Sequence, residues 1–126
     1  MRLELPWPPS ANRRLVPARG RWVTAPAYRA WQERAAEALL HWPTYKGNLW
    51  IPSDRLAVFI EACPPDNRRR DLDGLIKAPL DALVRARIVA DDSTRHITHV
   101  ACYLGPVVKG GLLRVTIESD TETPGR

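Results

Sequence analysis

Residues 56–63 read L-A-V-F-I-E-A-C, residues 72–84 read L-D-G-L-I-K-A-P-L-D-A-L-V, and residues 96–104 read H-I-T-H-V-A-C-Y-L. The first and third stretches are apolar runs of strand length, whereas the middle one repeats its apolar residues at helical spacing. Pro79 falls inside the helical pattern, so we expect it to kink the helix or to delay its regular part. The order predicts a β-α-β unit with both strands in one sheet.

The N-terminal third of the chain is rich in proline and arginine. Residues 2–6 alternate and predict a short strand, while residues 10–24 hold several arginines and are interpreted as a mobile basic loop. A helix is expected to begin at Pro26, where the missing N–H costs nothing, and to end at Pro43. Its apolar face is predicted to contain Tyr28, Trp31, Ala35, Ala38, Leu39 and Trp42.

The C-terminal part predicts one further strand. Residues 112–118 alternate, and glycines lie between them and residues 96–104, so we expect these two strands to form an antiparallel hairpin. The fold class is therefore α/β: one small domain over residues 1–118, with a mixed β-sheet and about two main helices. Residues 119–126 are expected to form a flexible tail.

Composition favours nucleic acid as a partner. The 126 residues carry a formal net charge of +5, and most of the positive charge is arginine, whose planar fork suits phosphate. Cys63 and Cys102 are far apart and form no disulfide framework, so both are expected to be reduced. No window reaches the ~18 apolar residues of a membrane span, and the start does not resemble a signal peptide. These features predict a cytoplasmic protein.

A run of charged residues at 68–77 carries the candidate chemistry. It reads R-R-R-D-L-D-G-L-I-K and is followed by the acid pair Asp91-Asp92. Asp71 and Asp73 are one residue apart, and carboxylates held close repel unless a cation neutralises them. Mg²⁺ prefers such oxygen ligands. Lys77 lies one helical turn after Asp73 and could stabilise negative charge in a transition state.

Simpler interpretations of the same residues stay open. The arginines and aspartates could form surface ion pairs worth about 0–1 kcal/mol each. Asp71 and Asp73 could instead be a helix cap and a first-turn acid, and Asp91-Asp92 could be an ordinary turn. Asp81, four residues after Lys77, could pair with it and hold it in place.

Two segments resemble the RusA family of Holliday junction resolvases. They are R-R-D-L-D-G-L-I-K-A-P-L-D-A-L at 69–83, followed by the acid pair, and P-W-P-P-S-A-N at 6–12. The resemblance covers nearly the whole chain in order and length. It implies a homodimeric α/β endonuclease that uses Mg²⁺ or Mn²⁺ to cut two strands of a four-way DNA junction. It places the metal-binding acids at Asp71, Asp73 and Asp92 and the catalytic lysine at Lys77.

The resemblance also predicts which residues contact DNA and shows one departure. The expected DNA-binding residues are Asn12, Arg13, Arg14, Arg68, Arg69 and Arg70. Trp7 and Trp22, in proline-rich or basic segments, could stack on an exposed base. The family has Asn after its second acid, where this chain has Gly74. Asn67 could substitute for that amide, or the chain could be a catalytically weak or inactive DNA-binding module. A basic protein-interaction domain is a third alternative.

Overall fold

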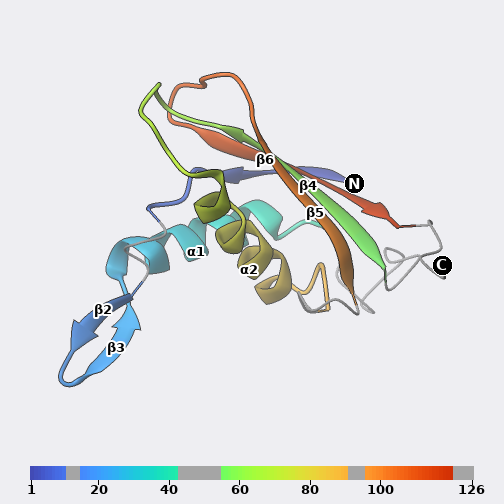
Figure 1. The fold of residues 1–126 in the computed structure, drawn as a ribbon. Helices are drawn as coiled ribbons and strands as arrows, with labels where there is room; N and C mark the ends of the chain where they lie inside the picture. The colour runs from blue at the N-terminus through green and yellow to red at the C-terminus, as the bar shows by residue number, and fades with distance from the viewer. Residues whose placement is uncertain (11–14, 43–54, 91–95, 121–126) are drawn as a thin grey trace.

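The computed structural model describes residues 1–10, 15–42, 55–90 and 96–120. A mixed four-stranded sheet has the order β1-β6-β4-β5 (Figure 1). Strands β4 and β5 pair in parallel, and β6 is antiparallel to both β4 and β1. The predicted β-α-β unit and mixed sheet are thus confirmed. The strand bounds are β1 Arg2–Pro6, β4 Leu56–Cys63, β5 Ile97–Leu104 and β6 Leu112–Ser119.

The predicted hairpin between the last two strands is wrong. The connection 105–111 carries the chain across the end of β4, so β6 inserts between β4 and β1. Two backbone bonds fix this path: Gly105 N–H donates to Ala62 O at 2.8 Å and Val108 N–H to Pro64 O at 2.9 Å. Seven residues easily span the roughly 10 Å between next-nearest strands. In this place β6 pairs with β4 along one edge and with β1 along the other.

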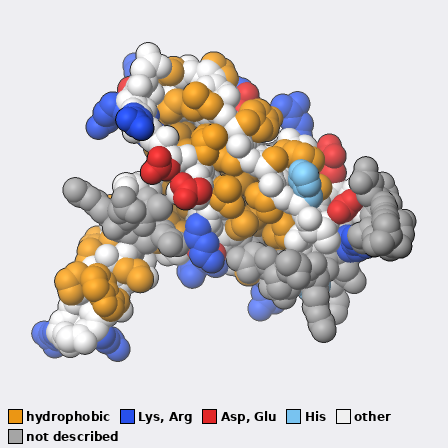
Figure 2. All heavy atoms as spheres, viewed as in Figure 1, with side chains coloured by type: hydrophobic (Ala, Val, Ile, Leu, Met, Phe, Trp, Pro, Cys, Tyr) orange, Lys and Arg blue, Asp and Glu red, His pale blue; other side chains and the backbone are white. Residues whose placement is uncertain are grey.

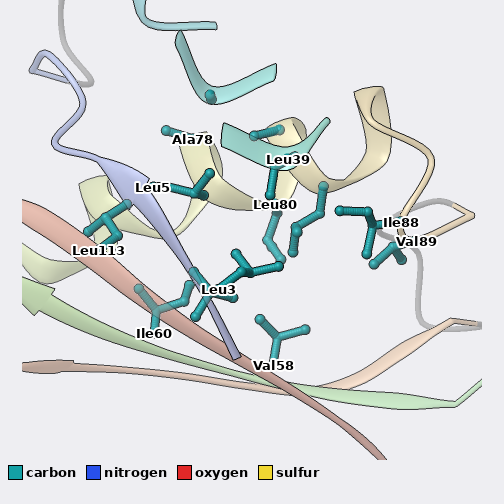
Figure 3. Packing of buried hydrophobic residues seen from close by; sticks show 14 of the residues in the cluster. Leu3, Leu5, Leu39, Val58, Ile60, Ala78, Leu80, Ile88, Val89 and Leu113 are labelled. Carbon is teal, nitrogen blue, oxygen red and sulfur yellow. The ribbon is translucent and has the colours of Figure 1, made fainter. Parts of the chain in front are cut away.

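Both long helices lie on one face of the sheet (Figure 1). Helix α1 spans Pro26–Leu39 and helix α2 spans Lys77–Arg85. Helix α1 begins where the sequence predicted, and its buried residues are four of the six predicted. Side chains of β1 and β4 meet both helices in the core (Figure 3). None of the helices in the described ranges combines the length and apolar character that a membrane crossing requires.

Pro79 delays the regular part of its helix, as the sequence predicted. The chain first forms a 3-10 helix over Leu72–Leu75, and α2 begins only at Lys77. Pro79 then lies in the first turn of α2, where its missing N–H leaves no hydrogen bond unmade. The acidic segment is consequently held in a short 3-10 turn rather than in a regular helix.

Residues 15–24 are ordered, so the expected basic loop is wrong for this part of it. Strands β2 (Leu15–Ala18) and β3 (Arg21–Thr24) form an antiparallel hairpin of their own. Arg19 and Gly20 connect them with φ angles of 50° and 83°. Two consecutive positive φ angles are the hallmark of a two-residue hairpin turn whose twist matches that of the strands. Arg19-Gly20 is not one of the dipeptides, such as Asn-Gly or Asp-Gly, that usually signal this turn in a sequence.

Candidate active site

An open groove lies beside the segment that leaves strand β4. It has a volume of about 790 Å³ and receives side chains from the turn after β1, the loop after β4 and the start of α2. Asp71 and Asp73, two of the predicted metal ligands, line it together with Lys77. The lining residues are Trp7, Pro8, Pro9, Ser10, Pro65, Arg68, Arg69, Arg70, Asp71, Asp73, Gly74, Leu75 and Lys77.

The wall opposite the acidic segment is anchored to the core. Fully buried Trp31 of α1 donates its indole N–H to Pro6 O at 2.8 Å, which holds the end of β1 just before Trp7. Gly111 supports the same wall from behind, with a φ angle of 71°. A Cβ there would lie 2.9 Å from both Trp7 and Pro65, so only glycine fits.

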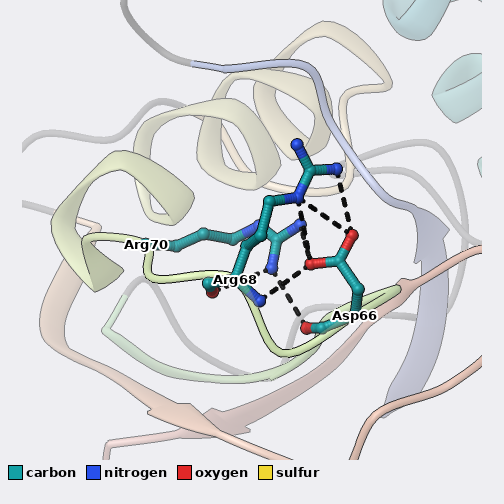
Figure 4. A network of polar contacts seen from close by, with 3 residues as sticks. All are labelled: Asp66, Arg68 and Arg70. Atoms are coloured by element: carbon teal, nitrogen blue, oxygen red, sulfur yellow. Dashed lines mark hydrogen bonds and ion pairs between the residues drawn. The ribbon is translucent and has the colours of Figure 1, made fainter.

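Two of the three predicted arginines at 68–70 are held by a neighbouring carboxylate, Asp66 (Figure 4). Arg68 contacts Asp66 Oδ2 through Nη2 at 3.0 Å, and its backbone N–H donates to Oδ1 at 2.9 Å. Arg70 Nη2 lies 2.8 Å from Asp66 Oδ1, and Arg70 Nη1 donates to the backbone oxygens of residues 66 and 68. Asp66 and the two arginines that bind it form a clamp. The clamp fixes the shape of the loop and the direction of both guanidinium groups.

The clamp also determines the ionisation of its members. The hydrogen bonds from the Arg68 side chain, then from its backbone N–H, hold the pKa of Asp66 well below the usual range of an aspartate. The same contact raises the pKa of Arg68. Arg70 additionally places its Cζ 5.4 Å from the ring centroid of Trp7, a cation–π contact across the groove. Arg69 is exposed and lines the groove as well.

Asp71 and Asp73 differ from Asp66 in having no such contacts. Both are exposed, and within the described part of the chain no ion pair or hydrogen bond engages either carboxylate. Asp71 at the N-cap of the 3-10 helix and Asp73 in its first turn lie where the simpler interpretation placed them, but the Asp71 carboxylate does not make a capping hydrogen bond. Two uncompensated carboxylates face one groove.

Lys77 is oriented from the core side of α2. Its Nζ lies 3.2 Å from Asp81 Oδ1, so the predicted pairing with Asp81 is confirmed. The other Asp81 oxygen accepts a hydrogen bond from the Tyr28 hydroxyl at 3.5 Å. The Lys77 side chain is still 51% exposed, so the ammonium group can reach a ligand in the groove while Asp81 limits its freedom.

Several predicted residues are outside the described ranges. They are Asn12, Arg13, Arg14, Asp91 and Asp92. The first described residue after Asp91-Asp92 is His96, whose backbone oxygen accepts a hydrogen bond from the Leu56 N–H at 2.8 Å. Leu56 begins β4, whereas Asp71 follows the other end of that strand. Asn67 is exposed and is not among the described residues that line the groove, whereas Gly74 is.

Sequence reasoning missed Asp66 and Gly111. Asp66 precedes the arginines in a P-P-D-N-R sequence, and an aspartate followed two residues later by a backbone donor is a known turn signal. This turn signal lies directly before the denser charges of residues 68–73. The sequence around Gly111 indicates only a connection. Its support of the groove depends on a contact between segments about a hundred residues apart, which no local pattern reveals.

The described donors suit a hard divalent cation. Asp71 and Asp73 offer oxygen ligands at an exposed groove, and Mg²⁺ is usually bound by one or two carboxylates with waters and substrate phosphate. The described residues contain no cluster of three potential ligands, and Asp92 is not among them. In the described part of the site, Asp71 and Asp73 are the carboxylates that could hold such a cation.

Comparison with known proteins identifies a class of nuclease. The family model for the endodeoxyribonuclease RusA matches residues 6–118. The crossover junction endodeoxyribonuclease RusA of Escherichia coli strain K12 is 37% identical over 115 residues, covering 91% of each chain. That of Enterobacteria phage 82 is 37% identical over 120 residues, and that of Shigella sonnei strain Ss046 is 36% identical over 115 residues, with the same coverage.

These matches place the chain in a class of endodeoxyribonucleases. The chain belongs to the RusA family. The resemblance inferred from the two sequence segments is thereby confirmed.

Proposed function

We propose that this chain is a metal-dependent crossover junction endodeoxyribonuclease that resolves four-way DNA junctions in recombination and repair. The observation that carries the proposal is the groove itself. It brings the carboxylates of Asp71 and Asp73, without protein partners in the described ranges, together with Lys77 and three arginines. The names of the relatives, crossover junction endodeoxyribonucleases, support the choice of substrate.

The residues of the groove divide the work between binding and chemistry. Asp71 and Asp73 would hold Mg²⁺, or Mn²⁺ in its place, and Asp92 is retained as the third acid on the resemblance alone. When bound there, the metal would supply a water of lowered pKa and would neutralise charge on the scissile phosphate. Lys77 stabilises the additional negative charge of the transition state. Hydrolysis breaks the P–O3′ bond and leaves a 5′-phosphate and a 3′-hydroxyl.

The arginines position the DNA. Arg68 and Arg70 reach the groove already oriented by Asp66, and Arg69 is exposed beside them. Guanidinium groups bind phosphate oxygens in a bidentate manner, which places the backbone without selecting a sequence. We assign Asn12, Arg13 and Arg14 to the same task on the resemblance. Affinity should fall steeply with salt, because counterions are released on binding.

We further propose that the active form is a homodimer in the cytoplasm. A four-way junction is nearly two-fold symmetric, so two copies related by a two-fold axis would present one groove to each of two strands. Each copy would then make one cut. The chemistry of a single groove depends neither on the dimer nor on the cellular location.

An inactive DNA-binding module is the weaker alternative. It rests on Gly74, but Gly74 lies in a right-handed 3-10 helix, while the acids and the lysine on either side of it all line the groove. A silenced relative has no need to retain uncompensated carboxylates beside bound phosphate, since they repel it. Family membership also favours the enzyme.

The test is cleavage of a synthetic four-way junction with end-labelled strands. With Mg²⁺ we expect paired, symmetric nicks with ligatable ends, and none when EDTA is present. Bound but uncut DNA in Mg²⁺ and in Mn²⁺ would favour the binding module. Absence of binding at low salt would favour a protein-interaction domain and reject the proposal.

A further inference from the structure

The β2–β3 hairpin lies at the N-terminal end of α1 and projects away from the sheet (Figure 1). Its register pairs Val16 with Val23 and Pro17 with Trp22, so the two faces of the hairpin are distinct. Val16 packs against the core, and Val23 is half-buried on the same face. The hairpin is therefore attached by one face only.

The other face is apolar and open to solvent. Trp22 is 68% exposed and Leu15 is 55% exposed, and Pro17 on the same face is also exposed. An exposed tryptophan contributes little to the fold, because its surface remains in water. Large apolar side chains gathered on a projecting element indicate a binding surface.

The charge around this face identifies its partner. Arg19 lies in the turn, and Arg21 precedes Trp22 on the other face of the hairpin, where it pairs with Ala18. Both arginines lie at the tip of the hairpin, and the sequence has no acidic residue between Glu4 and Glu33. Figure 2 shows the hydrophobic side chains on the hairpin, with basic side chains at its end. Two such hairpins would repel each other, so the charge disfavours self-association through this face. A polyanion with flat apolar surfaces fits it.

We propose that the hairpin is a second DNA contact, in which Trp22 stacks on a base at the exchange point of the junction while Arg19 and Arg21 hold the neighbouring phosphates. The inference rests on the proposed function. In duplex DNA both faces of each base are covered by its neighbours, whereas strand exchange interrupts that stacking at the centre of a junction. Stacking is tolerant of sequence because every base offers a flat face. Trp22 would thus help to distinguish a junction from a plain duplex.

The test compares Trp22→Ala, Trp22→Phe and the wild type in EDTA, where no DNA is cut. We expect Trp22→Ala to lose about ten- to a hundredfold in junction affinity and less than about twofold on a duplex, whereas Trp22→Phe keeps most of the affinity. Leu104→Ala is the matched control: Leu104 is 67% exposed on β5, and its removal should change neither affinity. With 2-aminopurine at the exchange point, wild-type binding should quench fluorescence, and Trp22→Ala binding should not.

The remaining outcomes are decisive as well. Equal junction affinity and quenching for Trp22→Ala and the wild type would overturn the inference. A smaller sedimentation mass for Trp22→Ala than for the wild type would also overturn it, because the hairpin would then be a contact between copies of the chain. Should Trp22→Ala fail to fold, the double variant R19S/R21S carries the test: the slope of log affinity against log salt should fall by about two. A wild type that binds junctions without cutting them would reject the proposed function instead.

Discussion

Two kinds of aspartate occur within eight residues of this chain. Asp66 is bound by two arginine side chains and a backbone N–H, and its pKa is held well below the usual range. Asp71 and Asp73 are exposed on the same groove, and no described residue forms an ion pair or hydrogen bond with their carboxylates. Arg68 and Arg70 are thus paired with Asp66 and not with Asp71 or Asp73.

The difference separates structure from chemistry in this segment. Asp66 uses its charge to shape the loop and to orient Arg68 and Arg70. The charges of Asp71 and Asp73 serve no comparable structural purpose in the described ranges, and both carboxylates line the groove where a cation could bind. We therefore expect changes to Asp71 and Asp73 to affect catalysis most, and changes to Asp66 to affect the positioning of the DNA.

The largest effect is expected for Asp73→Asn. It keeps the shape of the side chain and removes the charge that would hold the cation, so cleavage should fall by about 10³-fold or more. Junction binding should survive or tighten, since a charge that repels phosphate is gone. Single-turnover cleavage with a parallel binding titration measures both.

Glu118→Gln is the control for Asp73→Asn. Glu118 is exposed on β6 and is not among the described residues that line the groove, so this variant should cut at the wild-type rate. Normal cleavage by Asp73→Asn would show that the pair is not the metal site.

The next effect in size is expected for Lys77→Met. The aliphatic stem is retained, but the charge that would stabilise the transition state is lost, so kcat should fall about 10²- to 10³-fold. Junction affinity should change little, because the arginines still hold the phosphates. Lys109→Met is the matched control, since Lys109 is an exposed lysine outside the groove lining. An equal loss of affinity and of kcat would make Lys77 a DNA-binding residue instead.

Local patterns predicted most of the elements but not the way in which the strands pair. The β-α-β unit could be predicted because β4 and β5 are apolar runs of strand length and α2 repeats its apolar residues at helical spacing. The delay caused by Pro79 follows from its covalent structure. The position of β6 could not, because alternation shows which face of a strand is buried but not which neighbour it has. Residues 105–111 permit a hairpin and a crossing equally.

The candidate site divides in the same way. Asp71, Asp73 and Lys77 could be placed together because they are close in sequence and the spacing itself sets their relation. The support of the groove by Gly111 could not, since it depends on tertiary packing against Trp7. For Asp92 the spacing offers nothing, and its role stays a prediction outside the described residues.

A smaller effect is expected for Asp66→Asn, which tests the structural side of the comparison. Arg68 and Arg70 would lose their orientation, and the groove would gain one net positive charge. We therefore expect kcat on bound junction to fall about two- to fivefold, the range of a surface ion pair, while affinity is unchanged or higher. Unchanged kcat with tighter binding would mean that Asp66 only neutralises charge.

Asp66 should also leave a signature in acid. A lowered native pKa stabilises the folded state above the unfolded pKa of about 3.9, and this contribution is lost as the pH falls through that value and below. The wild type should exceed Asp66→Asn in stability by a constant margin above about pH 5. The margin should shrink below about pH 4, as measured by chemical unfolding at each pH. A margin independent of pH would show that the clamp does not depend on the Asp66 charge.

The smallest effect is expected at Gly74, between the two acids and the lysine. Its backbone lies in a 3-10 helix, a right-handed conformation that any residue adopts, so Gly74→Asn should fold and be slightly more stable. If an amide there orients a metal ligand or donates to phosphate, cleavage should rise by up to about threefold. Gly74→Ala separates the two contributions, because it removes the flexibility of glycine without adding an amide. A rate gain in Gly74→Asn alone would assign it to the amide, whereas a large loss in both variants would show that the groove has no room for a side chain at this position.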